Sequence, residues 1–247
     1  MRSILLRIGE RESGPDVYAA ASGVAVIAIA MLVIGPTLAL TLFPGAPFGL
    51  TPVLSWVLGG ALTTAFVLFA NRRSPGALRL GSTGLSTLFV MLAGIGAAIA
   101  LDVLSLGVTG SFLAAPELAA MVYGARGGLL DWLAALAFMA LVQPVTEELV
   151  FRGVAFPWLR QSLGGWAGLV ITALAYAAFH WLAYPPLYPE TVSLLAGQWY
   201  GLVLPFLAGL FIGAVRAYTG STRSAIAAHA AFGLFAALKA FAIASPS

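Results

Sequence analysis

The chain has 247 residues, of which 61% are hydrophobic and only 9% are charged, and its mean hydropathy is +0.99. A soluble globular protein is typically about 45–50% apolar and about 25% charged, so this composition excludes a soluble domain and indicates a polytopic membrane protein. The net charge of +3 does not predict a nucleic-acid partner, and the absence of cysteine excludes disulfides, thiolate metal sites and cysteine nucleophiles.

Seven apolar runs are long enough to span a bilayer, which takes about 20 mostly apolar residues per helix. In chain order they cover Val17–Phe43, Pro52–Ala70, Leu85–Val108, Gly128–Ser162, Gly165–Tyr184, Tyr200–Tyr218 and Ser224–Ile243. The stretch Phe112–Arg126 is a re-entrant helix, a surface helix or a short extra span. We therefore expect an all-α, polytopic transmembrane helical bundle of seven or eight spans.

The basic residues at the termini, in the loops and at the span ends gather mostly on one side of the membrane when seven spans are counted. These residues are Arg2, Arg7, Arg11, Arg72, Arg73, Arg79, Arg160, Arg216 and Arg223. Arg126 and Lys239 fall on the opposite side. Because loops rich in arginine and lysine stay in the cytoplasm, we expect a cytoplasmic amino terminus.

Seven ionisable residues interrupt apolar runs, where such side chains usually face the interior of a bundle or mark an active site. They are Asp102, Asp131, Glu147, Glu148, Arg152, His180 and His229. Asp102 and Asp131 lie near span ends, which favours a solvated or helix-capping role. The other five require another explanation.

Glu148 and Arg152 are four residues apart with the acid first, which is the favourable order for an ion pair on a helix. Glu147 points about 100° away and has no basic partner at helical spacing. A carboxylate in an apolar wall is a candidate general base for water. The alternative is that the cluster only stabilises a helix contact.

His180 and His229 differ in how well they fit a site around Glu147. A turn at Gly164 and Gly165 would place Glu147 and His180 at one depth on adjacent helices, each about 25 Å from the turn at 1.5 Å per residue. The same estimate places His229 only about 12 Å from that membrane side, so it joins them only if the helices tilt or shift. A structural role for His229 is the alternative.

Glu-Glu-x-x-x-Arg in an apolar helix, then an aromatic residue four positions before His180, then a distant His229, form a specific ordered pattern. This pattern, over Gln143–Phe235, resembles the type II CAAX prenyl endopeptidase family, also called the CAAX-processing and bacteriocin-processing (CPBP) family of intramembrane proteases. The resemblance divides the chain into amino-terminal transmembrane helices without a motif, residues 1–127, and a CAAX-protease-like catalytic core, residues 128–247.

The resemblance implies a role for each matching residue. Glu147 would activate the attacking water, with Glu148 and Arg152 supporting the site, and His180 would position or activate that water. His229 would stabilise the oxyanion. Tyr176 stands where the family usually has Phe.

Gly233 stands where the family usually has Asn as a second oxyanion donor, and losing one such donor costs about 100- to 1000-fold in rate. A backbone N–H, a water or a hydroxyl such as Thr172 or Ser224 would then substitute, or the activity would be weak or altered.

No metal cofactor is favoured, because the His-Glu-x-x-His pattern is absent. If a metal such as Zn²⁺ is present, Glu147, His180 and His229 are the candidate ligands, provided that His229 reaches the other two.

The leading hypothesis is an intramembrane endopeptidase that uses water activated by Glu147 and takes a membrane-associated peptide or protein as substrate. The alternatives are a membrane transporter or proton relay, and a catalytically weak, immunity-type scaffold. Arginine accounts for 11 of the 12 basic residues, a bias typical of GC-rich bacterial genomes. We therefore expect a multi-pass protein of the bacterial inner membrane, with the lipid bilayer as a partner and no nucleic-acid partner.

Overall fold

The computed structural model describes residues 4–46, 50–81, 85–124 and 128–245, and these segments contain helices and no strand. Seven helical segments are long and apolar enough to cross a membrane. They are Val17–Leu42, Leu50–Ala70, Thr87–Thr109, Leu129–Leu163, Gly165–Ala183, Leu194–Thr219 and Thr222–Ala244. The all-α transmembrane bundle is confirmed with seven candidate spans. Arg2 and Arg126 of the charge argument lie outside the described residues.

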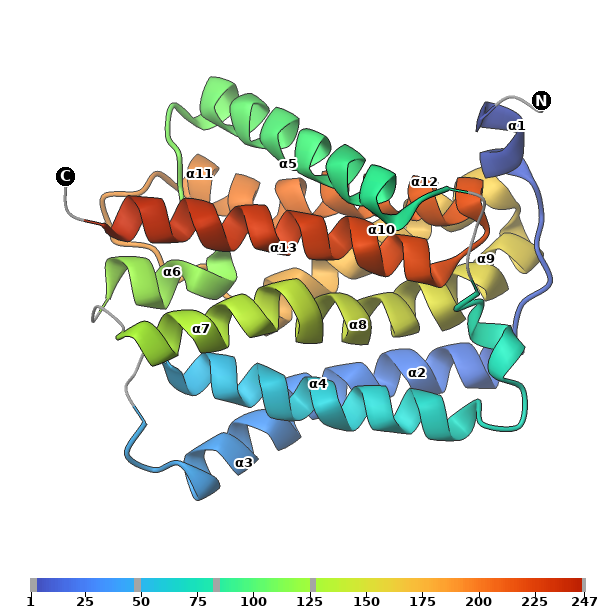
Figure 1. Ribbon diagram of the computed structural model, residues 1–247, viewed down its shortest axis with the longest axis horizontal. Coiled ribbons are helices and arrows are strands. Elements are labelled where there is room, and N and C mark those ends of the chain that lie inside the picture. The colour runs from blue at the N-terminus through green and yellow to red at the C-terminus, as the bar shows by residue number, and fades with distance from the viewer. Residues whose placement is uncertain (1–3, 47–49, 82–84, 125–127, 246–247) are drawn as a thin grey trace.

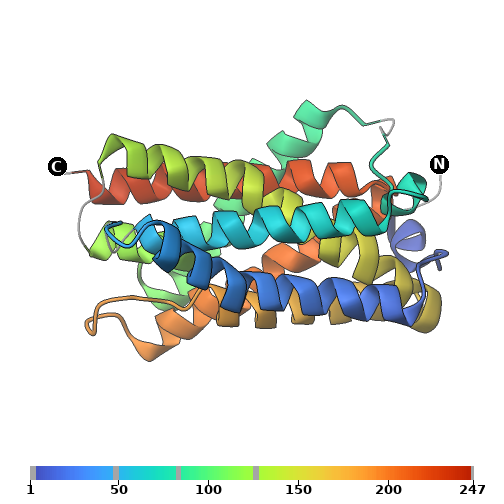
Figure 2. The ribbon, with the colours of Figure 1, turned by 90° about the horizontal axis from the view of Figure 1, so that it is seen from below.

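The described segments contain α-helices, π-helical turns and one 3₁₀ turn, most of which lie within the seven spans. They are α1 Ile4–Gly9, α2 Val17–Ile29, η1 Ala30–Ile34, α3 Gly35–Leu42, α4 Leu50–Ala70, η2 Pro75–Leu78 (a 3₁₀ turn), α5 Thr87–Thr109, α6 Pro116–Tyr123, α7 Leu129–Ala137, η3 Phe138–Val142, α8 Gln143–Glu148, η4 Leu149–Ala155, α9 Phe156–Leu163, α10 Gly165–Ala183, α11 Leu194–Gln198, η5 Trp199–Val203, α12 Leu204–Thr219 and α13 Thr222–Ala244. The spans lie side by side along the long axis of the molecule, with α1 and the carboxyl-terminal end of α13 at opposite ends (Figures 1 and 2).

Four prolines inside spans each lie two residues after a π-helical turn, whereas Pro52 lies in the first turn of α4. The turns η1, η3, η4 and η5 precede Pro36, Pro144, Pro157 and Pro205, respectively. Proline has no N–H to donate and its ring crowds the carbonyl four residues back, so the preceding turn widens. Two of these wide turns, η3 and η4, flank the Glu147–Glu148 pair.

The helix α6 (Pro116–Tyr123) resolves the ambiguity between the third and fourth runs. Its eight residues extend only about 12 Å at 1.5 Å per residue, far short of a span. Its residues 116–121 are all buried, so it is not a surface helix either. The helix contacts α13 and α4 and lies within the bundle (Figure 1), as a re-entrant element does.

The two acidic residues expected near span ends have different environments. Asp131 caps α7, where its Oδ2 accepts a hydrogen bond of 2.7 Å from Gly128 N, as the sequence predicted. The prediction for Asp102 is wrong, because this residue is only 7% exposed and its side chain pairs with Lys239 of α13. An ion pair between neighbouring helices explains why Asp102 is stable inside the third span.

Glu12, in the segment between α1 and α2, binds three arginines that come from three other parts of the chain. Its carboxylate accepts from Arg79 Nε at 2.8 Å, Arg160 Nη1 at 2.8 Å and Arg216 Nη2 at 2.6 Å. Arg160 and Arg216 are buried and are not free loop charges. The segment before α2 is thereby bound to the ends of α9 and α12.

Candidate active site

Glu147 and His180 form the centre of a buried polar cluster inside the bundle. Glu147 is the penultimate residue of α8 and is fully buried, and His180 lies near the end of α10. His180 Nε2 donates to Glu147 Oε2 at 3.0 Å, because a carboxylate can only accept. The two residues therefore lie at one depth, as the hairpin count predicted.

His229 also belongs to this cluster, although counting residues from the α12–α13 turn placed it at a different membrane depth from Glu147 and His180. Its Nδ1 donates to Glu148 Oε1 at 2.9 Å, and its Nε2 lies 4.0 Å from Glu147 Oε2. The start of α13 explains the difference, since Thr222 Oγ1 lies 3.5 Å from the carbonyl oxygen of Arg152. The α12–α13 turn therefore lies level with Arg152, while α9 continues for about three more turns beyond it.

Arg152 links Glu148 to the helices that carry the other site residues. Its Nη1 donates to Glu148 Oε1 at 3.1 Å, which confirms the predicted ion pair, and its Nη2 donates to the Gly209 carbonyl at 2.9 Å. Its guanidinium carbon lies 4.5 Å from the ring centre of Tyr176. Glu148 Oε2 and Arg152 Nε have no hydrogen-bond partner among the described residues. Unpaired buried polar atoms lower stability, so this cluster is not explained by stability alone.

Sequence reasoning missed Glu117, Gln143 and Tyr184. Glu117 of α6 accepts from Gln143 Nε2 at 2.9 Å, and its Oε1 lies 3.4 Å from His180 Nδ1. The one signal for Glu117 was an acidic residue after a proline in an otherwise uncharged stretch. His180 thus lies between two carboxylates.

Tyr184, one turn beyond His180, binds the other oxygen of Glu147. Its hydroxyl donates to Glu147 Oε1 at 2.5 Å. A carboxylate can only accept, so the hydroxyl is the donor in this contact. Both oxygens of Glu147 are therefore held in fixed directions.

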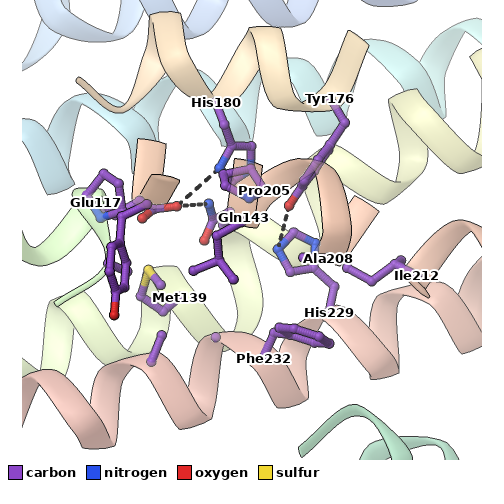
Figure 3. Close-up of a pocket in the computed structure, with 16 residues that line it drawn as sticks. Glu117, Met139, Gln143, Tyr176, His180, Pro205, Ala208, Ile212, His229 and Phe232 are labelled. Carbon is purple, nitrogen blue, oxygen red and sulfur yellow. Dashed lines mark hydrogen bonds and ion pairs between the residues drawn. The ribbon is translucent and has the colours of Figure 1, made fainter. Parts of the chain in front are cut away.

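A cavity of about 110 Å³ borders this cluster. Its wall includes Tyr176, His180, His229 and Gly233 of the predicted site residues, and Glu117 and Gln143 of the missed ones (Figure 3). Glu147, Glu148 and Arg152 lie behind that wall and do not line the cavity. The rest of the wall is mostly apolar, including Met139, Ala208, Ile212 and Phe232.

Comparison with known proteins gives a family for the segment that carries this cluster. Residues 129–235 match the family model described as type II CAAX prenyl endopeptidase Rce1-like. The chain therefore carries an Rce1-like domain. This match confirms the resemblance inferred from the Glu147-to-His229 pattern, whereas no curated protein and no solved structure matches the chain.

The Rce1-like domain contains all seven predicted site residues but not Glu117, which lies before it. Gly233 has no room for a side chain, because a Cβ there would lie 1.8 Å from the carbonyl oxygen of Met139 in η3. Close packing of α13 on η3 thus requires glycine at this position.

The two hydroxyls suggested as substitutes for the missing donor at Gly233 are not in the cavity wall. Thr172 Oγ1 donates to the Gly168 carbonyl of its own helix at 2.7 Å, and Ser224 lines a different cavity near Gly81. The expectation for these two residues is therefore wrong. Another group has to serve if the oxyanion has a second donor.

The suggested zinc ligands of the Rce1-like domain do not form a metal site. Among the described residues, no three His, Asp or Glu side chains are arranged to hold a metal ion. His180 Nε2 is bound to Glu147, and the two nitrogens of His229 are bound to Glu148 and Tyr176. The set Glu147, His180 and His229 thus does not fit a metal as it stands.

Proposed function

We propose that this protein is an intramembrane endopeptidase that hydrolyses a peptide bond with water activated by Glu147 and His180. The observation that carries the proposal is the contact of 3.0 Å between a fully buried glutamate and a histidine that lines a cavity within the membrane-spanning bundle. The Rce1-like domain supports a protease with a protein substrate in the membrane.

The proposed reaction has no covalent enzyme intermediate. A water on the cavity side of His180 attacks the carbonyl carbon, and its proton passes to the Glu147–His180 pair as the new C–O bond forms. When the C–N bond breaks, that proton is transferred to the leaving nitrogen, and the products are a carboxylate and an amine. Glu147 lies behind the cavity wall here, and hydrogen bonds of this kind often tighten only when substrate binds.

His229 is proposed to stabilise the oxyanion that forms in the tetrahedral intermediate. Its Nδ1 donates to Glu148 Oε1 at 2.9 Å, which leaves Nε2 as the ring nitrogen available to the cavity that His229 lines. In the proposed reaction, Nε2–H donates to the oxyanion. Arg152 fixes Glu148 and thereby the orientation of this histidine.

The mostly apolar wall suits a substrate segment with apolar side chains that enters from the membrane. We propose a membrane-associated peptide or protein as the substrate, a cytoplasmic amino terminus, and the inner membrane of a bacterium as the location. We also propose that residues 128–247 form the catalytic core and that residues 1–127 supply Glu117.

The proposal is tested by cleavage of a fluorogenic peptide with a prenylated CAAX end by the purified full chain in lipid nanodiscs. Glu147→Gln and His180→Ala should each lower kcat by about 10²- to 10⁴-fold, the range of a general acid or base. Glu190→Gln is the matched control, because Glu190 lies on an exposed loop away from the cavity. A chelator should leave the rate unchanged.

Two results would overturn the proposal. Equal rates for the wild type and Glu147→Gln, or no cleavage by any of them, would favour a transporter, a proton relay or a scaffold. Loss of activity with chelator and recovery with Zn²⁺ would exclude the metal-free reaction.

A further inference from the structure

Few polar groups of the cavity wall are available to donate to an oxyanion. Glu117 can only accept as a carboxylate, and Gln143 Nε2 is bound to it at 2.9 Å. The Tyr200 hydroxyl donates to the Ser111 carbonyl at 3.0 Å, away from the catalytic cluster. His180 Nε2 is bound to Glu147, and its Nδ1 faces Glu117 Oε1 at 3.4 Å. These contacts leave Tyr176 and His229.

Tyr176 and His229 meet at one point of the wall from opposite helices. The Tyr176 hydroxyl of α10 lies 3.3 Å from His229 Nε2 of α13, and Figure 3 shows the two groups pointing toward each other. His229 is the one hydrogen-bond partner that Tyr176 Oη has among the described residues. Two groups at this separation can both reach a single oxygen at about 2.7–3.1 Å, the distance required of oxyanion donors.

We propose that Tyr176 is a catalytic residue whose hydroxyl donates, together with His229 Nε2–H, to the oxyanion of the tetrahedral intermediate. The inference rests on the proposed hydrolysis. Before reaction, His229 Nδ1–H donates to Glu148 and Nε2–H donates to the oxygen of the Tyr176 hydroxyl. As the oxyanion forms, Nε2–H and the Tyr176 hydroxyl proton both turn to it, and neither group gains or loses a proton.

The close packing around Gly233 is a second, independent reason to expect the oxyanion donor on α10 and not at position 233 of α13. A side chain on α13 one turn beyond His229 would have to start at Gly233, where a Cβ lies 1.8 Å from the Met139 carbonyl. Tyr176 reaches the same region from the opposite wall. Its ring is held edge-on to Phe151 at 5.5 Å between centres and lies under the Arg152 guanidinium.

Tyr176→Phe tests the hydroxyl alone, because the ring and its packing remain. In the nanodisc assay, kcat should fall by about 10²- to 10³-fold, the effect of one oxyanion donor, while KM changes less than about threefold. The inhibition constant of a tetrahedral phosphonamidate analogue of the substrate should rise by a similar factor. Tyr18→Phe is the matched control, since Tyr18 is 82% exposed on α2 and lies outside the cavity wall.

A double-variant cycle separates a direct donor from a residue that only positions His229. If Tyr176 contacts the oxyanion itself, Tyr176→Phe should still lower the rate at least fivefold in a His229→Ala background, measured at high enzyme concentration. A kcat within twofold of wild type for Tyr176→Phe, or no further loss in that background, would overturn the inference. If Glu147→Gln is inactive in the same experiments, only the role of Tyr176 fails; if Glu147→Gln is fully active, the proposed function fails as well.

Discussion

Among the described glycines, an added Cβ would make its shortest contact at Gly233, so Gly233→Ala is a sharp test of helix packing. A methyl group at this position would lie 1.8 Å from the Met139 carbonyl oxygen and 2.6 Å from its carbonyl carbon. Since real Cβ atoms stay beyond about 3.0 Å, α13 and η3 would have to separate by more than 1 Å.

The cost follows from what would have to move. Overpacking costs typically about 1–3 kcal/mol when side chains can adjust, but here the obstacle is backbone. The η3 turn is also fixed from its other side, where Phe138 stacks on Trp56 with ring centres 5.4 Å apart. We expect a loss of about 3 kcal/mol, which is on the order of 100-fold in the folding equilibrium.

The measurement is thermal unfolding of the purified protein in detergent, followed by tryptophan fluorescence. Gly96→Ala and Gly107→Ala are matched controls, because both glycines lie within α5 with no atom within 4 Å of the added methyl group. These controls should keep or slightly raise the melting temperature, as alanine is about 0.5–1 kcal/mol better than glycine within a helix. A melting temperature for Gly233→Ala equal to that of the wild type would refute the close approach of α13 and η3. Gly233→Asn should be at least as unstable, so installing the family's usual residue should not increase activity.

Three further substitutions test other contacts. Glu12→Gln should lower stability by about 3 kcal/mol in the same melting assay, because three guanidinium groups lose their shared counter-charge; an unchanged melting temperature would show that this cluster does not hold the amino-terminal segment. Lys239→Met should also lower the free energy of unfolding by about 3 kcal/mol, because Asp102 would be left buried and unpaired. Combining Lys239→Met with Asp102→Leu should restore most of that stability, and no recovery would contradict the pairing. Glu117→Gln should lower kcat at least about tenfold with little change in KM, because His180 would lose the carboxylate that orients its ring. The expected loss is part of the about 10²- to 10⁴-fold that a general acid or base contributes. Wild-type kinetics for this variant would exclude an orienting role for Glu117.

The sequence predicted the spans and the Glu147–His180 contact because both depend on local regularities. Span length follows from hydropathy, and the two residues lie on helices joined by one short turn at Gly164, whose φ of 92° favours glycine. Along such a hairpin, counting residues measures depth. The sixth span was drawn too short, from Tyr200 and not from Leu194, because Gly197 and Gln198 interrupt its apolar run.

The rest of the site depends on contacts between segments far apart in the chain. The depth of His229 is set by where the α12–α13 turn packs against Arg152, which its own hairpin does not determine. Glu117 reaches His180 because the chain before α6 is held by two tyrosines, with Leu113 N donating to the Tyr200 hydroxyl at 3.2 Å and Ala114 N to the Tyr123 hydroxyl at 3.0 Å. Neither arrangement leaves a periodic pattern in the sequence.

The geometry of the site therefore depends on helices that lie outside the segment carrying the family pattern. Thr146, the residue before Glu147, donates to the Gly60 carbonyl at 3.1 Å and lies 3.0 Å from Thr64 Oγ1, so α4 fixes α8 at the point where the glutamates begin. Glu117 contributes a second carboxylate to His180 from outside residues 129–235. A pattern confined to Glu147, His180 and His229 indicates the proposed chemistry, but the positions of the helices that carry these side chains depend on helices without a motif. Substitutions on α4 and α6 should consequently change kcat without touching the substrate, whereas lipid-facing positions of the same helices should not.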